Sequence, residues 1–363
     1  MKIKLLLKTL AFFTLILTSV FCFAAKEVVN VYSWSSYISQ ETIRDFEKKH
    51  KIKINYDVYD SNEMLDAKLL AGNTGYDLVF PSDNPFLKNQ IKLGIYQELD
   101  KKLLPNIKNM DPLFLNMMSK EDPGNKYAMP WLWGLTGFAI NKEKVLEIDP
   151  DAPIDSLELI FNPKYAKKIA KCGINFLDSA TEIIPLALLY HGFNPNTTDP
   201  DELKKAGETL KAISPYIKTF NSSSYDDLFV DDSVCVGISW SGDIVKANEK
   251  LKAKKSKTRL SFVLPKEGFL MATDTMAIPK DAPNKKNAYI LLNYLMEAKV
   301  AANNSNYTKY YNGNKASYKY LEKDLRDNKP NDSTLLKGYR IDPYPPKTLR
   351  LVNRIWTGVI TGN

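Results

Sequence analysis

The fold is decided by residues 28–81, which read VVNVYSWSSYISQETIRDFEKKHKIKINYDVYDSNEMLDAKLLAGNTGYDLVFP. Hydrophobic periodicity predicts five elements here, in the order strand, helix, strand, helix, strand: residues 28–34, 39–50, 52–59, 62–71 and 77–81. Ser39 is suited to cap the first helix, and Gly72 to end the second. This alternation predicts an α/β fold with a parallel sheet covered by helices.

Three junctions between strands and helices carry polar and aromatic residues: 34–37, 59–62 and 81–84. In open α/β sheets, ligands bind where the strands end and the helices begin. The sequence therefore places candidate binding residues at three neighbouring points of the first sheet.

A second α/β body is predicted after an aromatic-rich stretch at 131–133 and a strand over 135–141 that leaves the first body. Its predicted elements are strands over 173–177 and 234–240, and helices over 182–191, 201–213 and 243–252. A strand over 275–279 and a helix over 284–297 return the chain to the first body. A chain of 363 residues suits two such lobes, with a cleft between them.

The first 24 residues are typical of a secretory signal peptide. Lys2, Lys4 and Lys8 precede an apolar run over 10–23, and Ala24 is suited to a cleavage site. Cleavage lowers the formal net charge from +8 to +5, because it removes three lysines. The remaining Lys and Arg residues are spread along the chain, which does not favour a nucleic-acid binder.

Cysteine and histidine usage bounds the chemistry further. Cleavage would leave Cys172 and Cys235 as a pair in an oxidising compartment, where we expect a disulfide. Closing that loop stabilises the fold by roughly 4 kcal/mol in the chain-entropy view. His50 and His191 are the only histidines, which are too few for most metal sites and catalytic sites that depend on histidine. No metal and no cofactor is expected.

Aromatic rings, hydroxyls and carboxylates come together at predicted strand ends in the segments 34–37, 240–243 and 273–274. An ammonium group binds carboxylates and the negative faces of aromatic rings, so this pattern indicates recognition of a cationic amine. Each residue alone also fits a structural role. Asp243 suits the first turn of a helix, Glu182 could form a capping box with Ser179, and Trp34 and Trp240 could be core residues.

Two alternatives use other residues. Adjacent Tyr310 and Tyr311 could bind ferric iron as phenolates, with a carboxylate partner. The paired acids at 226–227 and 231–232 could serve an exported hydrolase. Residues 237–242, GISWSG, do not form a Gly-x-Ser-x-Gly elbow, and no Gly-x-Gly-x-x-Gly or Walker-type loop is present.

With these segments in hand, the chain resembles the periplasmic putrescine- and spermidine-binding proteins of bacterial ABC uptake systems. The matching stretches follow the family order along nearly the whole mature chain: residues 31–38, 59–63, 75–82, 128–134, 176–178, 238–243 and 274–279. The resemblance implies a type II periplasmic-binding-protein fold of two lobes, a polyamine ligand, no enzymatic activity and delivery to ABC permease subunits in the inner membrane. It also implies a periplasmic monomer.

Carried over position by position, the family's ligand contacts fall on ten residues: Trp34, Ser35, Ser36, Tyr37, Ser82, Glu182, Trp240, Asp243, Asp274 and Tyr310. The rings would line the alkyl chain, and the three acids would take the terminal ammonium groups. We expect a first lobe of residues 25–137 and 274–318 and a second of 138–273 and 319–363.

Two positions depart from the family pattern. Ser36 replaces an acid and Ala272 replaces an aromatic ring, so the sequence predicts a wider site suited to agmatine, cadaverine or a bulkier cation as well as putrescine. The cysteine pair matches a disulfide of putrescine-type members. Together with Ser179, which stands where a spermidine-type member has an acid, the pair indicates the diamine branch.

Overall fold

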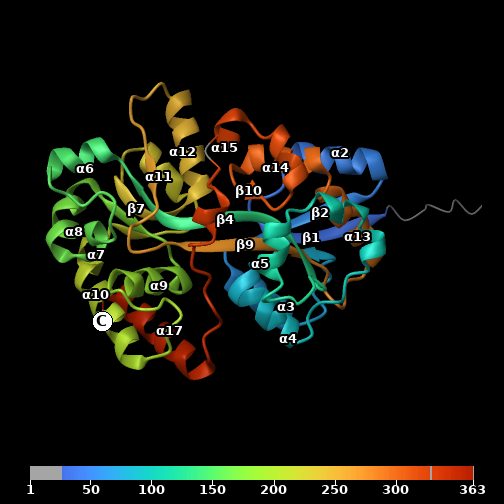
Figure 1. The fold of residues 1–363 in the computed structure, drawn as a ribbon, viewed down its shortest axis with the longest axis horizontal. Helices are drawn as coiled ribbons and strands as arrows, with labels where there is room; N and C mark the ends of the chain where they lie inside the picture. Colours follow the sequence, from blue (N-terminus) through green and yellow to red (C-terminus); the bar gives the residue numbers. More distant parts are fainter. Residues whose placement is uncertain (1–26, 328, 363) are drawn as a thin grey trace, which may run out of the picture.

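The computed structural model describes residues 27–327 and 329–362, so the predicted signal peptide, residues 1–24, lies outside the described residues. Figure 1 shows two halves side by side, joined by the long strands β4 (Ala128–Ile140) and β9 (Leu270–Ala277). Over these described ranges, no helix has the length and apolar character needed to cross a membrane.

In the described part of the chain one sheet runs through both halves, in the order β2-β1-β3-β9-β4-β7-β5-β6, and β8 and β10 also pair with β4. The other strands are β1 (Val28–Trp34), β2 (Lys53–Tyr59), β3 (Leu78–Val79), β5 (Ile174–Phe176), β6 (Thr219–Phe220), β7 (Val236–Trp240), β8 (Ser261–Val263) and β10 (Tyr311–Asn312).

The strand directions confirm the expected α/β architecture. In the first half β1 lies between β2 and β3 and is parallel to both, with Val28 opposite Lys53 and Val31 opposite Leu78. In the second half β5 is parallel to β6 and β7. Strands β4 and β9 are antiparallel to each other and carry the chain between the halves.

Helices of the first half cover the β2-β1-β3 part of the sheet (Figure 1). They are α2 (Gln40–His50), α3 (Asn62–Leu70), α4 (Lys88–Lys92), α5 (Pro112–Met118), α13 (Lys285–Leu295) and α14 (Ala298–Thr308), with shorter turns η1 (Asp83–Leu87), η2 (Lys101–Leu103), η3 (Pro105–Asn109) and η6 (Lys315–Tyr320). Ser39 caps α2 as predicted, because its Oγ accepts a hydrogen bond from the Thr42 amide at 3.0 Å.

Helices of the second half surround β5, β6 and β7. They are α6 (Lys142–Ile148), α7 (Glu158–Phe161), α8 (Pro163–Ile169), α9 (Ala180–Tyr190), α10 (Pro200–Ile213), α11 (Tyr225–Val230), α12 (Ser241–Ala253) and α17 (Pro346–Thr361), with the short turns η4 (Ala170–Cys172) and η5 (Ser214–Tyr216). The C-terminal α17 packs against α9 and α10, so the end of the chain lies in this half.

Each half has its own apolar core. The second-half core runs from Phe138 on β4 to Val359 on α17, and the first-half core includes Val31 and Phe46. Helices α15 (Lys323–Asp327) and α16 (Asp332–Leu335) contribute to a further cluster, in which Leu325 packs near Phe114 and Trp133. Trp240 packs against the cores of both halves, which places it at their junction.

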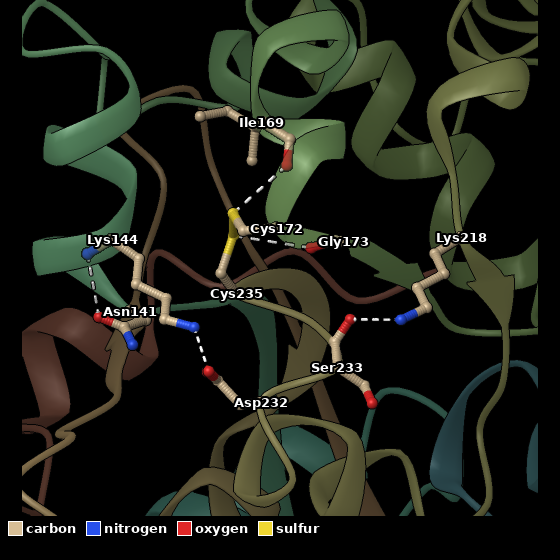
Figure 2. Close-up of a disulfide and its surroundings, with 9 residues drawn as sticks. All are labelled: Asn141, Lys144, Ile169, Cys172, Gly173, Lys218, Asp232, Ser233 and Cys235. Atoms are coloured by element: carbon tan, nitrogen blue, oxygen red, sulfur yellow. Dashed lines mark hydrogen bonds and ion pairs between the residues drawn. A yellow bond between two sulfur atoms is a disulfide. The ribbon is translucent and has the colours of Figure 1, made fainter.

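Cys172 and Cys235 form a disulfide, as predicted, with their Cα atoms 5.5 Å apart (Figure 2). Gly173 makes this approach possible, because a Cβ there would lie 2.3 Å from the carbonyl oxygen of Ser233. The Gly173 φ angle of 88° also falls in the region that favours glycine. Lys218 anchors the same loop by donating to the Ser233 carbonyl at 2.8 Å.

A C-terminal segment makes a third connection beside β4 and β9. The Tyr339 amide donates to the Phe269 carbonyl, and the Met271 amide donates to the Tyr339 carbonyl, both at 2.9 Å. One residue later the Arg340 carbonyl accepts from the Asn196 side chain of the second half at 2.9 Å.

Candidate functional site

The carboxylate of Asp274, on β9, is the centre of a hydrogen-bonded group at the junction of the halves. It accepts hydrogen bonds from the hydroxyl of Tyr37 and from the Oγ of Ser82, the latter at 2.5 Å. Asn62 holds Ser82 in place, because its side chain both donates to the Oγ and accepts from the amide. Burial raises the pKa of Asp274 to about 7, although the bonds from Ser82 and Tyr37 lower it.

Three aromatic rings of the first half lie beside this carboxylate. The ring of Trp34, at the end of β1, lies 4.8 Å from Tyr59 and 6.3 Å from Tyr37 between centroids. The indole nitrogen of Trp34 donates to the Phe80 carbonyl at 3.2 Å, which fixes the ring. Tyr37 in turn meets the ring of Tyr310 edge-on at 6.2 Å. The rings thus form a continuous aromatic wall from β1 to Tyr310.

Glu182, in the first turn of α9, joins the site from the second half. Its Oε1 accepts hydrogen bonds from the Trp240 indole and from the Thr136 hydroxyl, both at 2.7 Å. Ser179 makes no side-chain cap of α9, so Glu182 points to Trp240 rather than forming the capping box considered above. Burial raises the pKa of Glu182, and the bonds from Trp240 and Thr136 lower it.

Asp243, in the first turn of α12, supplies the third carboxylate. The hydroxyls of Tyr225 and Tyr310 donate to it, and burial raises its pKa. Tyr225 also accepts a hydrogen bond from the Trp240 amide at 2.9 Å, and its ring lies 6.0 Å from the Trp240 ring. These bonds connect Asp243 to Trp240 and therefore to Glu182.

Two glycines fix the position of Tyr310. A Cβ at Gly242 would lie 2.6 Å from ring atoms of Tyr310, and one at Gly134 would lie 3.0 Å from them. The Tyr310 ring is therefore held closely against β4 on one side and the start of α12 on the other.

The structure brings eight of the ten predicted residues into one connected group: Trp34, Tyr37, Ser82, Glu182, Trp240, Asp243, Asp274 and Tyr310. Ser35 and Ser36 lie exposed in the turn between β1 and α2. Ser36 has a left-handed backbone with a φ angle of 55°. These two serines lie next to the site because they connect Trp34 and Tyr37 in the chain.

Sequence reasoning missed three residues that shape the site: Tyr225, Thr136 and Gly242. Gly242 lies within the stretch 238–243 that matches the family, and it directly precedes Asp243. Its place in the site could therefore have been predicted from the sequence. Tyr225 and Thr136 carry no such signal, because their roles depend on contacts with Asp243 and Glu182 that only the tertiary structure creates.

The site is acidic in a protein of basic overall composition. Glu182 is influenced by the charge of Glu63, at the start of α3, and Asp274 by that of Glu182 and of buried Asp83. Carboxylates from both halves therefore face the same region, and their mutual repulsion favours a bound cation.

The alternatives are not supported. The ring of Tyr311 stacks on Trp133 at 4.6 Å, away from Tyr310, so the two phenols do not converge. Across residues 27–327 and 329–362 no group of three or more His, Cys, Asp or Glu side chains could hold a metal ion. The paired acids have lysine partners instead: Asp226, which is buried, and Asp227, which is exposed, both pair with Lys250, and exposed Asp231 pairs with Lys254.

Comparison with known proteins identifies the family. Residues 41–331 match the bacterial extracellular solute-binding proteins. The putrescine-binding periplasmic protein SpuD of Pseudomonas aeruginosa (strain UCBPP-PA14) is 42% identical over 343 residues, and PotF of Escherichia coli (strain K12), with the same description, is 40% identical over 344; each alignment covers 93% of both chains. A putative spermidine/putrescine ABC transporter from Listeria monocytogenes has the same fold, with a TM-score of 0.83, 29% identity and coverage of 93% of this chain and 100% of that one. The chain therefore belongs to the bacterial extracellular solute-binding proteins and has their two-lobed type II periplasmic-binding-protein fold.

Proposed function

We propose that this protein captures a polyamine, with putrescine as the first candidate, between its two lobes and delivers it to an ABC importer. The observation that carries the proposal is the meeting of three carboxylates, Asp274, Glu182 and Asp243, with aromatic rings from both halves. The relatives SpuD and PotF, described as putrescine-binding, support the choice of ligand.

The chemistry of the site suits a flexible dication. Burial raises the pKa of all three carboxyls, so the hydrogen bonds that they accept compensate their ionised forms only in part. Ammonium groups at both ends of a diamine supply that compensation through charge-assisted hydrogen bonds. The rings of Trp34, Tyr37 and Trp240 would line the alkyl chain between them.

Binding would favour the closed arrangement of the lobes, because a ligand that contacts both lobes makes all its contacts only when they are closed. In this proposal the lobes comprise residues 25–137 with 274–318, and residues 138–273 with 319–363. Asp274 and Tyr37 act from the first lobe, and Glu182 and Asp243 from the second.

The cellular setting follows from the same proposal. The signal peptide would be cleaved near Ala24, and the mature protein would act in the periplasm as a monomer that passes its ligand to permease subunits in the inner membrane. It would bind and release its ligand without changing it chemically, and no cofactor or nucleic acid takes part.

Isothermal titration calorimetry of the mature protein, refolded to strip bound ligand, tests this function. The titrants are putrescine, cadaverine, agmatine, spermidine and iron(III) citrate. We expect micromolar or tighter binding of at least one diamine, which corresponds to about −8 kcal/mol or better. A response to iron(III) citrate alone, or silence toward every amine, would overturn the proposal.

Substitutions connect that binding to the site. Asp274→Ala and Trp240→Ala should abolish amine binding while the far-UV circular dichroism stays that of the wild type. Asp231→Ala is the matched control, because Asp231 is an exposed acid paired with Lys254. Wild-type affinity in both site variants would show that the amine binds elsewhere.

A further inference from the structure

Lys246 places a cation of the protein itself at one end of the candidate site. It lies on α12, one turn after Asp243, and its Nζ is 3.7 Å from Asp243 Oδ1. The same Nζ lies 5.9 Å from the centroid of the Tyr310 ring. A carboxylate and an aromatic face are the two partners that a ligand ammonium would seek in this place.

Lys250 and Lys254, which follow Lys246 at intervals of four residues, have other partners. Lys250 is held by Asp226 and Asp227 at 2.7 and 2.6 Å, and Lys254, the residue after the helix, is held by Asp231 at 2.7 Å. The Lys246–Asp243 contact at 3.7 Å is longer than a hydrogen bond. The ammonium therefore offsets the charge of Asp243 but leaves its oxygens able to accept hydrogen bonds from other donors.

The charge of the site follows from this arrangement. Asp274, Glu182 and Asp243 carry three negative charges when ionised, and Lys246 returns one positive charge. Asp83 is paired with Arg340 and Glu63 is exposed, so neither enters this count. The remaining charge of minus two matches a ligand with two ammonium groups. A third ammonium would have to share Asp243 with Lys246, at a separation where like charges repel strongly in a partly buried site.

We propose that Lys246 is a specificity-determining residue, which sets the site for diamines and disfavours triamines by occupying the environment of Asp243 and Tyr310. The inference rests on the proposed function and deepens it. Lys246 acts by charge and not by shape, so an uncharged side chain of similar length relieves the exclusion.

Calorimetric titrations with putrescine and spermidine test the inference in four proteins: the wild type, Lys246→Gln, Lys246→Met and Lys254→Gln. Removing the charge at Lys246 should tighten spermidine binding about tenfold or more and change putrescine binding much less. Lys254→Gln removes the same charge from a solvent-exposed position near the end of the helix and should leave both affinities unchanged. The Lys246 side chain is 30% exposed, so both substitutions are compatible with folding.

A double variant that restores the net charge of the site tests whether charge alone explains the effect of Lys246. Adding Asp243→Asn to Lys246→Gln returns the site to a charge of minus two, and the spermidine gain should disappear. If the wild type binds putrescine and the ratio of the two affinities is the same in both Lys246 variants, Lys246 does not set specificity and the proposed function stands. If the wild type binds no amine, both proposals fall together.

Discussion

Arg340 donates through Nη2 to Oδ2 of Asp83 at 2.5 Å, and the Asp83 side chain is only 1% exposed. Asp83 follows β3 in the first half, whereas the Arg340 carbonyl accepts from Asn196 in the second. Burial raises the pKa of Asp83, and the Arg340 guanidinium lowers it. This ion pair therefore ties the C-terminal connection to the strand end beside Asp274.

Arg340→Ala should destabilise the protein by about 3–5 kcal/mol, because it leaves a buried carboxylate without its partner. The free energy of unfolding in guanidinium chloride measures this loss. Arg350→Ala, on an exposed position of α17, is the control and should change stability by less than about 0.5 kcal/mol. Equal stability of the two variants would show that Asp83 is satisfied without Arg340.

Amine affinity should fall as the pH decreases through about 7, the pKa that burial imposes on Asp274 in the ligand-free protein. A bound ammonium favours the ionised carboxylate, so binding below this pH must release a proton. We expect binding about tenfold weaker at pH 6 than at pH 8, since aliphatic amines stay charged across this range.

Calorimetry in buffers of different ionisation heat counts the protons that are released on binding.

The stability of the folded protein should depend on pH in the opposite direction from amine affinity. The raised folded-state pKa of Asp274 gives a stability contribution that is present at low pH and is lost as the pH rises toward about 7. Affinity that is independent of pH, without proton release, would contradict the assignment of Asp274 as a ligand carboxylate.

The first half could be predicted closely, because β1, β2 and α2 carry a clear hydrophobic period, Ser39 caps α2, and Gly72 follows the end of α3. The start of strand β4 could not be predicted from the sequence. The pattern indicates a strand from residue 135, whereas β4 begins at Ala128. Both halves cover this strand, so its residues are buried without alternation.

Residues of the candidate site such as Asp274 and Trp240 could be predicted, because their side-chain chemistry and the family-matching stretches indicate the same positions. The residues that hold them in place could not be predicted. Tyr225 reaches Asp243 from a different helix, and Thr136 reaches Glu182 from a strand that belongs to both halves. Such pairings depend on how elements far apart in the sequence pack, which no local pattern encodes.

Gly242→Ala should weaken amine binding at least tenfold without unfolding the protein. The added Cβ would lie 2.6 Å from the Tyr310 ring, so the ring must leave its position between Gly134 and Gly242. Alanine in place of glycine favours a helix, which keeps α12 intact. Tyr310→Phe is the companion variant, since it keeps the ring and removes the hydroxyl. Wild-type affinity in Gly242→Ala would mean that the position of Tyr310 is unimportant for the ligand.

Removing the Cys172–Cys235 disulfide should lower stability and leave amine affinity unchanged. The bond closes a loop with a sequence separation of 63 residues, which corresponds to roughly 4 kcal/mol in the chain-entropy view. Cys235 precedes β7 and Trp240 ends it, so the disulfide and the site lie at opposite ends of one strand. Unfolding of the Cys172→Ser, Cys235→Ser double variant measures the stability loss, and calorimetry on the folded variant measures affinity. A large loss of affinity at a temperature where the variant stays folded would mean that the disulfide shapes the site along β7, rather than only restricting the unfolded chain.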